Sequence, residues 1–358
     1  MSTVNKPASL FFEQFGARGT IIGPSPMRTG SPLGQSVAIL LWMTLPVAAG
    51  YGLWHAALKR RAEGDRLASS LARLLSHAAM LGAAAPLSLL LFWVALVPVG
   101  RALLLPLVGL FVHAFGGAAA WGMARAGRHD ARTQGAYWLS GASSNVLTFG
   151  GIVTILLLRS EVDPHAEKAL AEVALYRIFE APFYFLCAWP FAARLSATGA
   201  KPSFRDSFRP VTTVPLAGIV LGWALNLGGV PRPPALDGVA EILVKANVIL
   251  MGLTVGLTLR RAAPVRHRAS CLRMSSVKFL LVPAVSALLA WLLGFRGVTL
   301  QIVAVCASMP VAFMAVVASN LLQLDEELVG SLWLFTTAGM LVVVPALAFL
   351  LPAIGGVT

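Results

Sequence analysis

The sequence predicts an all-α membrane protein that crosses the bilayer several times. Hydrophobic residues make up 57% of the 358 residues and charged residues only 12%, and the mean hydropathy is +0.78. Soluble domains carry about 25% charged residues, so this chain has too few to cover a water-facing surface. Apolar stretches of about 20 residues recur along the chain, and this length matches the hydrocarbon core of a bilayer. The protein is therefore expected to be an integral, multi-pass membrane protein.

Ten apolar stretches are expected to form transmembrane helices. They lie at 36–58, 77–98, 102–123, 135–158, 174–194, 211–228, 239–259, 275–295, 298–322 and 329–353. Residues 1–35 are polar and rich in Gly, Pro and Ser, which predicts a disordered N-terminal segment. We expect residues 36–194 to form a first set of five helices, residues 195–210 a cytoplasmic linker, and residues 211–358 a second set of five.

Basic residues gather in the loops on one side of the predicted membrane. These loops contain Lys59, Arg60, Arg61, Arg66 and Arg73, then Arg125, Arg128 and Arg132, then Arg194, Lys201, Arg205 and Arg209, and finally Arg260, Arg261, Arg266, Arg268 and Arg273. Cytoplasmic loops are enriched in Lys and Arg, so this side is predicted to be cytoplasmic. Both termini are then predicted to be non-cytoplasmic.

The sequence gives little support for other classes of protein. Cys187, Cys271 and Cys306 lie far apart, with no metal-binding spacing, and no nucleotide-binding, zinc-protease or serine-hydrolase motif is present. We therefore expect no enzyme activity, no catalytic residues, no cofactor and no metal site. The net charge of +13 lies mainly in the loops, so it is interpreted as a topology signal and not as a nucleic-acid-binding surface.

A proline inside the predicted ninth helix is the strongest local signal. Pro310 follows Ser308 and Met309 in the middle of the apolar run 298–322. Proline removes a backbone donor and clashes with the preceding turn, so the helix must break or kink there. A plain proline kink is the alternative, because proline is common in membrane helices.

The two predicted sets of helices share features at corresponding positions. Leu45-Pro46 corresponds to Val214-Pro215, Leu105-Pro106 to Val282-Pro283, and Ser143-Ser144-Asn145 to Ser308-Met309-Pro310. Because each set has an odd number of helices, the second set must be inverted relative to the first. Inverted repeats place a substrate site near the midplane, where discontinuous helices meet. We therefore expect a substrate site near the midplane, at the discontinuous helices.

With these features the chain resembles the auxin efflux carrier family over about 36–353. The resemblance rests on Leu45-Pro46 through Leu53, Ser143-Ser144-Asn145, Met309-Pro310 leading to Asn320-Leu321, and Phe335-Thr336-Thr337-Ala338 through Val344-Pro345. It implies ten helices in two inverted sets, a site where the fourth and ninth helices cross, and transport of organic anions. The family is related in architecture to the sodium–bile-acid symporters, which would place sodium ligands at the crossing.

One position departs from the family pattern. A typical first crossing helix carries Asn, a glycine, and a proline two residues later; Asn145 and Gly150 fit, but Ile152 stands at the proline position. Whether this helix is broken stays open, and Gly150-Gly151 offers another way to loosen it. The candidate substrate-binding residues are Ser143, Ser144, Asn145, Gly150, Gly151, Met309, Pro310 and Asn320.

Two charged side chains within the spans are candidates for coupling. Glu180 lies three residues after Arg177, and Lys245 lies four after Glu241. Ionisable residues in a span are functional candidates because burying them is costly. The helical spacing also offers each of them a partner, and this structural interpretation is favoured over proton coupling by Glu180 or anion attraction by Lys245.

Three functions are compatible with the sequence. The leading one is a secondary transporter of small organic anions that works by alternating access. A sodium-coupled symporter and a non-transporting scaffold or sensor are the alternatives. The expected partners are a small organic anion and the lipid bilayer, without nucleic acid, and a homodimer is left open.

Overall fold

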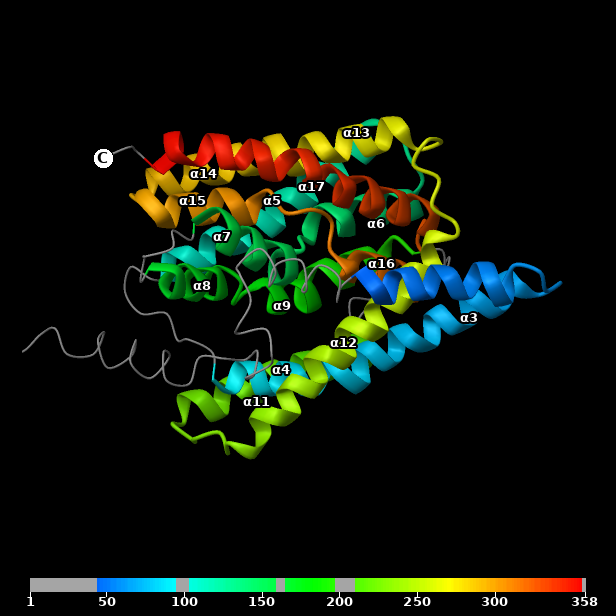
Figure 1. Cartoon of the computed structure of the whole chain (residues 1–358), viewed down its shortest axis with the longest axis horizontal. Coiled ribbons are helices and arrows are strands. Elements are labelled where there is room, and N and C mark those ends of the chain that lie inside the picture. Colours follow the sequence, from blue (N-terminus) through cyan, green and yellow to red (C-terminus); the bar gives the residue numbers. More distant parts are fainter. Residues whose placement is uncertain (1–43, 95–102, 159–164, 197–209, 356–358) are drawn as a thin grey trace, which may run out of the picture.

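Figure 1 shows the computed structural model of the protein, which is built from helices. The structure describes residues 44–94, 103–158, 165–196 and 210–355. The predicted N-terminal segment and most of the predicted linker lie outside the described residues. Within the described ranges there is no β-strand, and the chain forms one isolated antiparallel bridge, between Ser144 and Val311.

The helical segments follow one another with short connections. Residues 44–53 are helical and lead into a wider π-helical turn, η2 (Trp54–Leu58). The others are α3 (Gly64–His77), η3 (Ala78–Ala84), α4 (Ala85–Trp93), α5 (Leu104–Ala126), α6 (Ala131–Ala142), η5 (Val146–Gly150), α7 (Gly151–Leu158), α8 (His165–Tyr176), α9 (Glu180–Phe183), η6 (Tyr184–Ala188), α10 (Trp189–Arg194), α11 (Pro210–Leu227), α12 (Ala235–Leu259), α13 (Arg268–Ser276), η8 (Val277–Leu281), α14 (Val282–Leu292), α15 (Gly297–Ala307), α16 (Phe313–Leu322) and α17 (Glu326–Gly355).

In the part of the chain that the structure describes, five helices are long and apolar enough to cross a membrane. They are Gly64–Trp93, Leu104–Ala126, Ala235–Leu259, Arg268–Leu292 and Glu326–Ile354. Helical segments overlap every predicted span, which agrees with an integral, multi-pass membrane protein. The grouping of the helices into two inverted sets of five stays a prediction.

The helices form two bundles that each combine early and late parts of the chain. The first bundle contains residues 44–58, α3, η3, α4, α11 and α12, and the crossing bundle contains α5 to α10 and α13 to α17. Figure 1 shows the first bundle below the crossing bundle in this view. The bundles meet where α16 packs on α3 and α12, where α17 packs on α12, and where α11 packs on α9 and η6.

The second predicted span begins earlier than expected. The basic residues Arg66 and Arg73 were expected in a loop, but they lie on α3, which continues without interruption into η3 and α4. The cause is amphipathicity: Ala68 and Ala72 are fully buried on one face, while both arginines are exposed on the other. Charge lowers the mean hydropathy of this stretch without preventing a helix.

Small residues allow the helices of the crossing bundle to approach closely. A Cβ added at Gly116 of α5 would collide with the carbonyl of Gly141 on α6, and one added at Gly141 would collide with the carbonyl of Gly116 and with Ala120. Membrane helices associate through such small residues because lipid provides no hydrophobic force to bring them together. This packing fixes the end of α6 beside α5.

Candidate functional site: two broken helices that cross

The first broken helix ends at Ala142 and resumes at Val146. Ser143 has an extended backbone (φ −108°, ψ 132°), and Asn145 also leaves the helical region (φ −81°, ψ 54°). The backbone N–H and the hydroxyl of Ser143 both donate to the carbonyl of Leu139, at 3.0 and 2.8 Å. The Leu139 carbonyl therefore keeps its ordinary helical partner and accepts a second bond from the serine hydroxyl.

The second broken helix ends at Ala307 and resumes at Phe313. Ser308 closes α15 with bonds from its N–H and its hydroxyl to the carbonyl of Ala304, at 3.2 and 2.7 Å. The chain is then non-helical as far as Ala312, which is extended (φ −78°, ψ 155°). The break predicted at Pro310 is confirmed.

The two breaks pair with each other through their backbones. The N–H of Asn145 donates to the carbonyl of Pro310 at 2.9 Å, and Ser144 and Val311 form the antiparallel bridge. The N–H of Val311 also donates to the Thr336 hydroxyl of α17, at 3.3 Å. Ser144, Asn145 and Met309 are 2%, 6% and 0% exposed. The structure thus brings five predicted site residues, Ser143, Ser144, Asn145, Met309 and Pro310, to one buried crossing.

The open question about the first crossing helix is answered by this geometry. The helix is broken, although Ile152 replaces the family's proline, and the break lies at Ser143–Asn145, before the Gly150-Gly151 pair. Gly150 ends the π-helical turn η5 close to the Met309 side chain, and Gly151 starts α7. Proline is not needed here because side chains from other helices receive the freed backbone groups.

Two of those side chains close the end of α6. Lys278, from η8, donates from Nζ to the carbonyls of Gly141 and Ser143 at 3.0 and 2.6 Å and to the Ser144 hydroxyl at 2.9 Å. His113, from α5, lies 2.9 Å from the carbonyl of Ala142 through Nδ1. Because a carbonyl only accepts, Nδ1 must carry the hydrogen. Lys278 and His113 are each 1% exposed.

The sequence reasoning missed both of these residues. Lys278 lies inside the predicted span 275–295 and His113 inside 102–123. A lone lysine in an apolar run was an available signal, since a charge within a span is rare and costly. The proximity of Lys278 to Ser143 and Ser144 was not available, because 134 or more positions separate them in sequence.

Asn320 and Lys245 lie away from the crossing, whereas Glu180 is close enough to interact electrostatically with Lys278 and His113. Asn320 is buried near the end of α16 and donates through Nδ2 to the Thr258 hydroxyl of α12, at 2.8 Å, so it joins the two bundles. Glu180 forms the expected ion pair with Arg177, at 2.7 Å. Lys245 is exposed on α12, and the side chain of its expected partner, Glu241, lies outside the described residues.

Ionic contacts surround the junction of the bundles on the basic side. Arg261 binds Glu326 of α17 at 2.8 Å and the Ser69 hydroxyl of α3 at 3.0 Å. Arg260 bonds to Ser69 and Asp65, and its side chain is 1% exposed. Burial lowers the pKa of Arg260 from its usual value, the nearby Arg261 lowers it further, and Asp65 opposes both effects.

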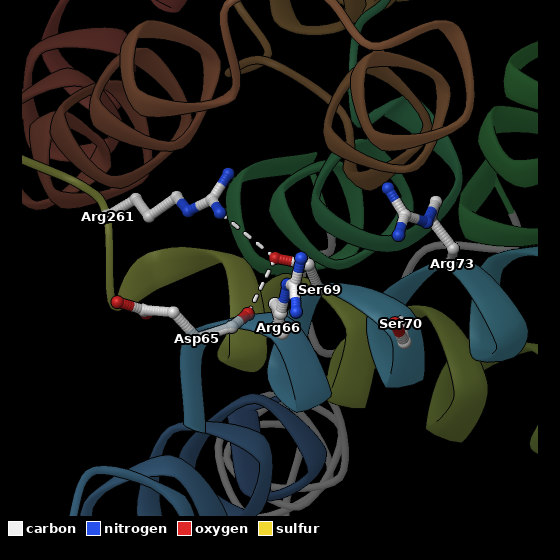
Figure 2. A pocket seen from close by; sticks show the side chains of 6 residues that line it. All are labelled: Asp65, Arg66, Ser69, Ser70, Arg73 and Arg261. Carbon is white, nitrogen blue, oxygen red and sulfur yellow. Dashed lines mark hydrogen bonds between the residues drawn. The ribbon is translucent and has the colours of Figure 1, made fainter. Parts of the chain in front are cut away.

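A surface pocket of about 390 Å³ lies at this junction. Figure 2 shows Arg261 and Arg73 on its two sides, with Arg66 and Ser69 between them. The pocket is open to the basic side and does not reach the buried crossing residues, none of which lines it.

Comparison with known proteins supports the expected resemblance. Residues 201–348 match a family described as membrane transport protein, the auxin efflux carriers. An uncharacterized transporter of Methanothermobacter thermautotrophicus is 32% identical over 137 residues, which are 38% of this chain and 45% of that protein. The chain thus spans less than half the length of this curated relative. The resemblance to the auxin efflux carrier family is confirmed through residues 201–348, which contain the second broken helix and Lys278.

Proposed function

We propose that the protein is a secondary transporter of small organic anions, with its solute site at the crossing of the two broken helices. The observation that carries this proposal is the pairing of Ser144–Asn145 with Pro310–Val311 inside the crossing bundle. Non-helical backbone at membrane depth is tolerated only where protein or a water-filled cavity receives it. Transporters use such discontinuous helices to bind solutes near the midplane.

The charge distribution at the crossing favours an anion. The helices that resume at Val146 and Phe313 direct their N-terminal, partly positive ends at the crossing. The opposing C-terminal end of α6 has its carbonyls bonded to the Lys278 ammonium group. Among the described residues, the hydrogen bonds of Lys278 go to carbonyls and a hydroxyl, and the Glu180 carboxylate, which is paired with Arg177, attracts it only at longer range. A carboxylate would restore neutrality.

Alternating access would require the two bundles to separate on one side at a time. On the basic side they are joined by Asn320–Thr258 and Arg261–Glu326, and the crossing residues are buried. We propose that these two contacts break when the basic side opens. The crossing itself lies within one bundle, so it would move as a unit.

The proposal is tested in two stages with the purified full-length protein. A thermal-shift screen against small carboxylates identifies a ligand, because a compound that binds the folded state raises the melting temperature. Uptake of that ligand into proteoliposomes is then measured for Asn145→Ala and Pro310→Ala. Each change is expected to lower transport more than tenfold, or by about 1.4 kcal/mol. Asn145→Ala removes an amide, and Pro310→Ala allows α15 and α16 to join.

Two control variants remove groups of similar size away from the crossing. Cys187→Ala changes an exposed position of η6, and Ser286→Ala changes a buried hydroxyl of α14. Both are expected to transport at near wild-type rates. Equal losses in the control and crossing variants would mean that the crossing serves only packing, and a scaffold role would then be favoured.

A further inference from the structure

The ammonium group of Lys278 is held at the first break like a bound cation. An ammonium has three N–H donors and no acceptor, and all three donors point to oxygens of the segment Gly141–Ser144. Two of the oxygens are backbone carbonyls at the broken end of α6, and the third is a hydroxyl. Unwound carbonyls and half-helix C-terminal ends are the groups that coordinate Na⁺ in transporters with broken helices.

Capping alone does not explain a charged residue at this position. The carbonyl of Ala142 is bonded to a His113 ring nitrogen, and that of Leu139 accepts from both the N–H and the hydroxyl of Ser143. Uncharged groups can thus close the same helix end, whereas a charge within the membrane carries a large desolvation penalty. What Lys278 adds beyond these caps is a tethered amine that can carry a positive charge at the site.

We propose that Lys278 is a tethered cation that occupies the position of a coupling ion, so that the protein binds and carries its solute without sodium. The three oxygens are already bonded to Nζ, and a second cation would be repelled by the first. The proposal extends the transport function proposed above, and its consequence for transport rests on that function. Its test needs no solute, so it can fail or succeed independently of that function.

The test measures how sodium changes the melting temperature of the purified full-length protein. The wild type is compared in NaCl and in choline chloride of equal ionic strength, and it is expected to melt at the same temperature in both. Lys278→Ala removes the ammonium group and leaves the oxygens of Gly141, Ser143 and Ser144 facing the space that it occupied. We expect this variant to melt at a lower temperature in choline and to regain stability in NaCl, with saturation at increasing sodium.

Two further variants separate charge from space and from hydrogen bonding. Lys278→Met fills the space with an apolar chain and should lose stability without regaining it in sodium. Lys278→Gln keeps an N–H donor without the charge. It replaces the alanine variant if that variant does not fold in choline chloride. In that case it is purified in NaCl, and the sodium is then withdrawn. Lys59→Ala, at an exposed lysine after η2, is the matched control and should behave as the wild type.

Several results would overturn the proposal. A sodium-specific rise in the melting temperature of the wild type would show that a separate sodium site exists. A loss of stability in Lys278→Ala that sodium does not restore would show that the lysine serves as packing or a cap. Unchanged stability of Lys278→Ala in choline would show that the ammonium group is not needed at the break.

Discussion

Thr258→Val should open the contact between the bundles on the basic side. Thr258 and Asn320 are 0% and 2% exposed, and the bond between them, at 2.8 Å, crosses from α12 to α16. Valine has nearly the same shape as threonine but lacks the hydroxyl. The Nδ2 group of Asn320 keeps its bond to the carbonyl of Val316, at 3.1 Å, and loses its second acceptor.

The size of the effect follows from the burial of this amide. A buried donor without a partner costs about 1–3 kcal/mol, whereas a donor that can reach water costs little. The penalty therefore falls on the closed arrangement and not on an open one in which Asn320 is hydrated. The ratio of closed to open molecules should fall by roughly 5- to 150-fold.

The assay measures the distance between the bundles by double electron–electron resonance. Spin labels are placed at Ser70 of α3 and Ala131 of α6, which are exposed on the basic side, after Cys187, Cys271 and Cys306 have been replaced. Thr258→Val should increase the population at longer distances. Thr254→Val is the matched control, because that buried hydroxyl bonds to the carbonyl of Leu250 in its own helix, at 2.9 Å. Equal distributions for the two variants would refute the reasoning.

Two other predictions concern orientation and packing. If the basic loops are cytoplasmic, a single cysteine near Arg60 should resist an impermeant thiol reagent in intact cells and one near Arg232 should react; the reverse pattern would contradict the orientation. Gly141→Val should lower the free energy of unfolding by about 1–3 kcal/mol, because a Cβ there collides with Gly116 and Ala120. A Cβ at Gly82 meets nothing within 4 Å, so Gly82→Val should cost less in a denaturant titration. Similar losses in both glycine variants would argue against close packing of α5 on α6.

The positions of the helices and the second break could be predicted from the sequence. Hydropathy locates the spans because lipid selects apolar residues wherever a helix faces it. Pro310 predicts a break by itself, since proline lacks the N–H that a continuous helix needs. In both cases the signal is local to the residues that form the structure.

The first break could not be located from its own residues. Ser143, Ser144 and Asn145 are compatible with a continuous helix, and the glycine pair further along was the more visible weak point. The break depends on Lys278 and His113, which come from other helices, and on the backbone of Pro310. The beginning of α3 was missed for a different reason, because an exposed arginine face has the composition of a loop.

Locating a bound carboxylate directly would test the central claim. The measurement is an electron cryo-microscopy map of the full-length protein at a saturating concentration of a ligand from the thermal-shift screen. We predict density for the carboxylate at the crossing, within about 3 Å of polar groups of Ser144, Asn145 or the Pro310–Ala312 segment. Density at the arginine-lined pocket of Figure 2, with none at the crossing, would contradict the account.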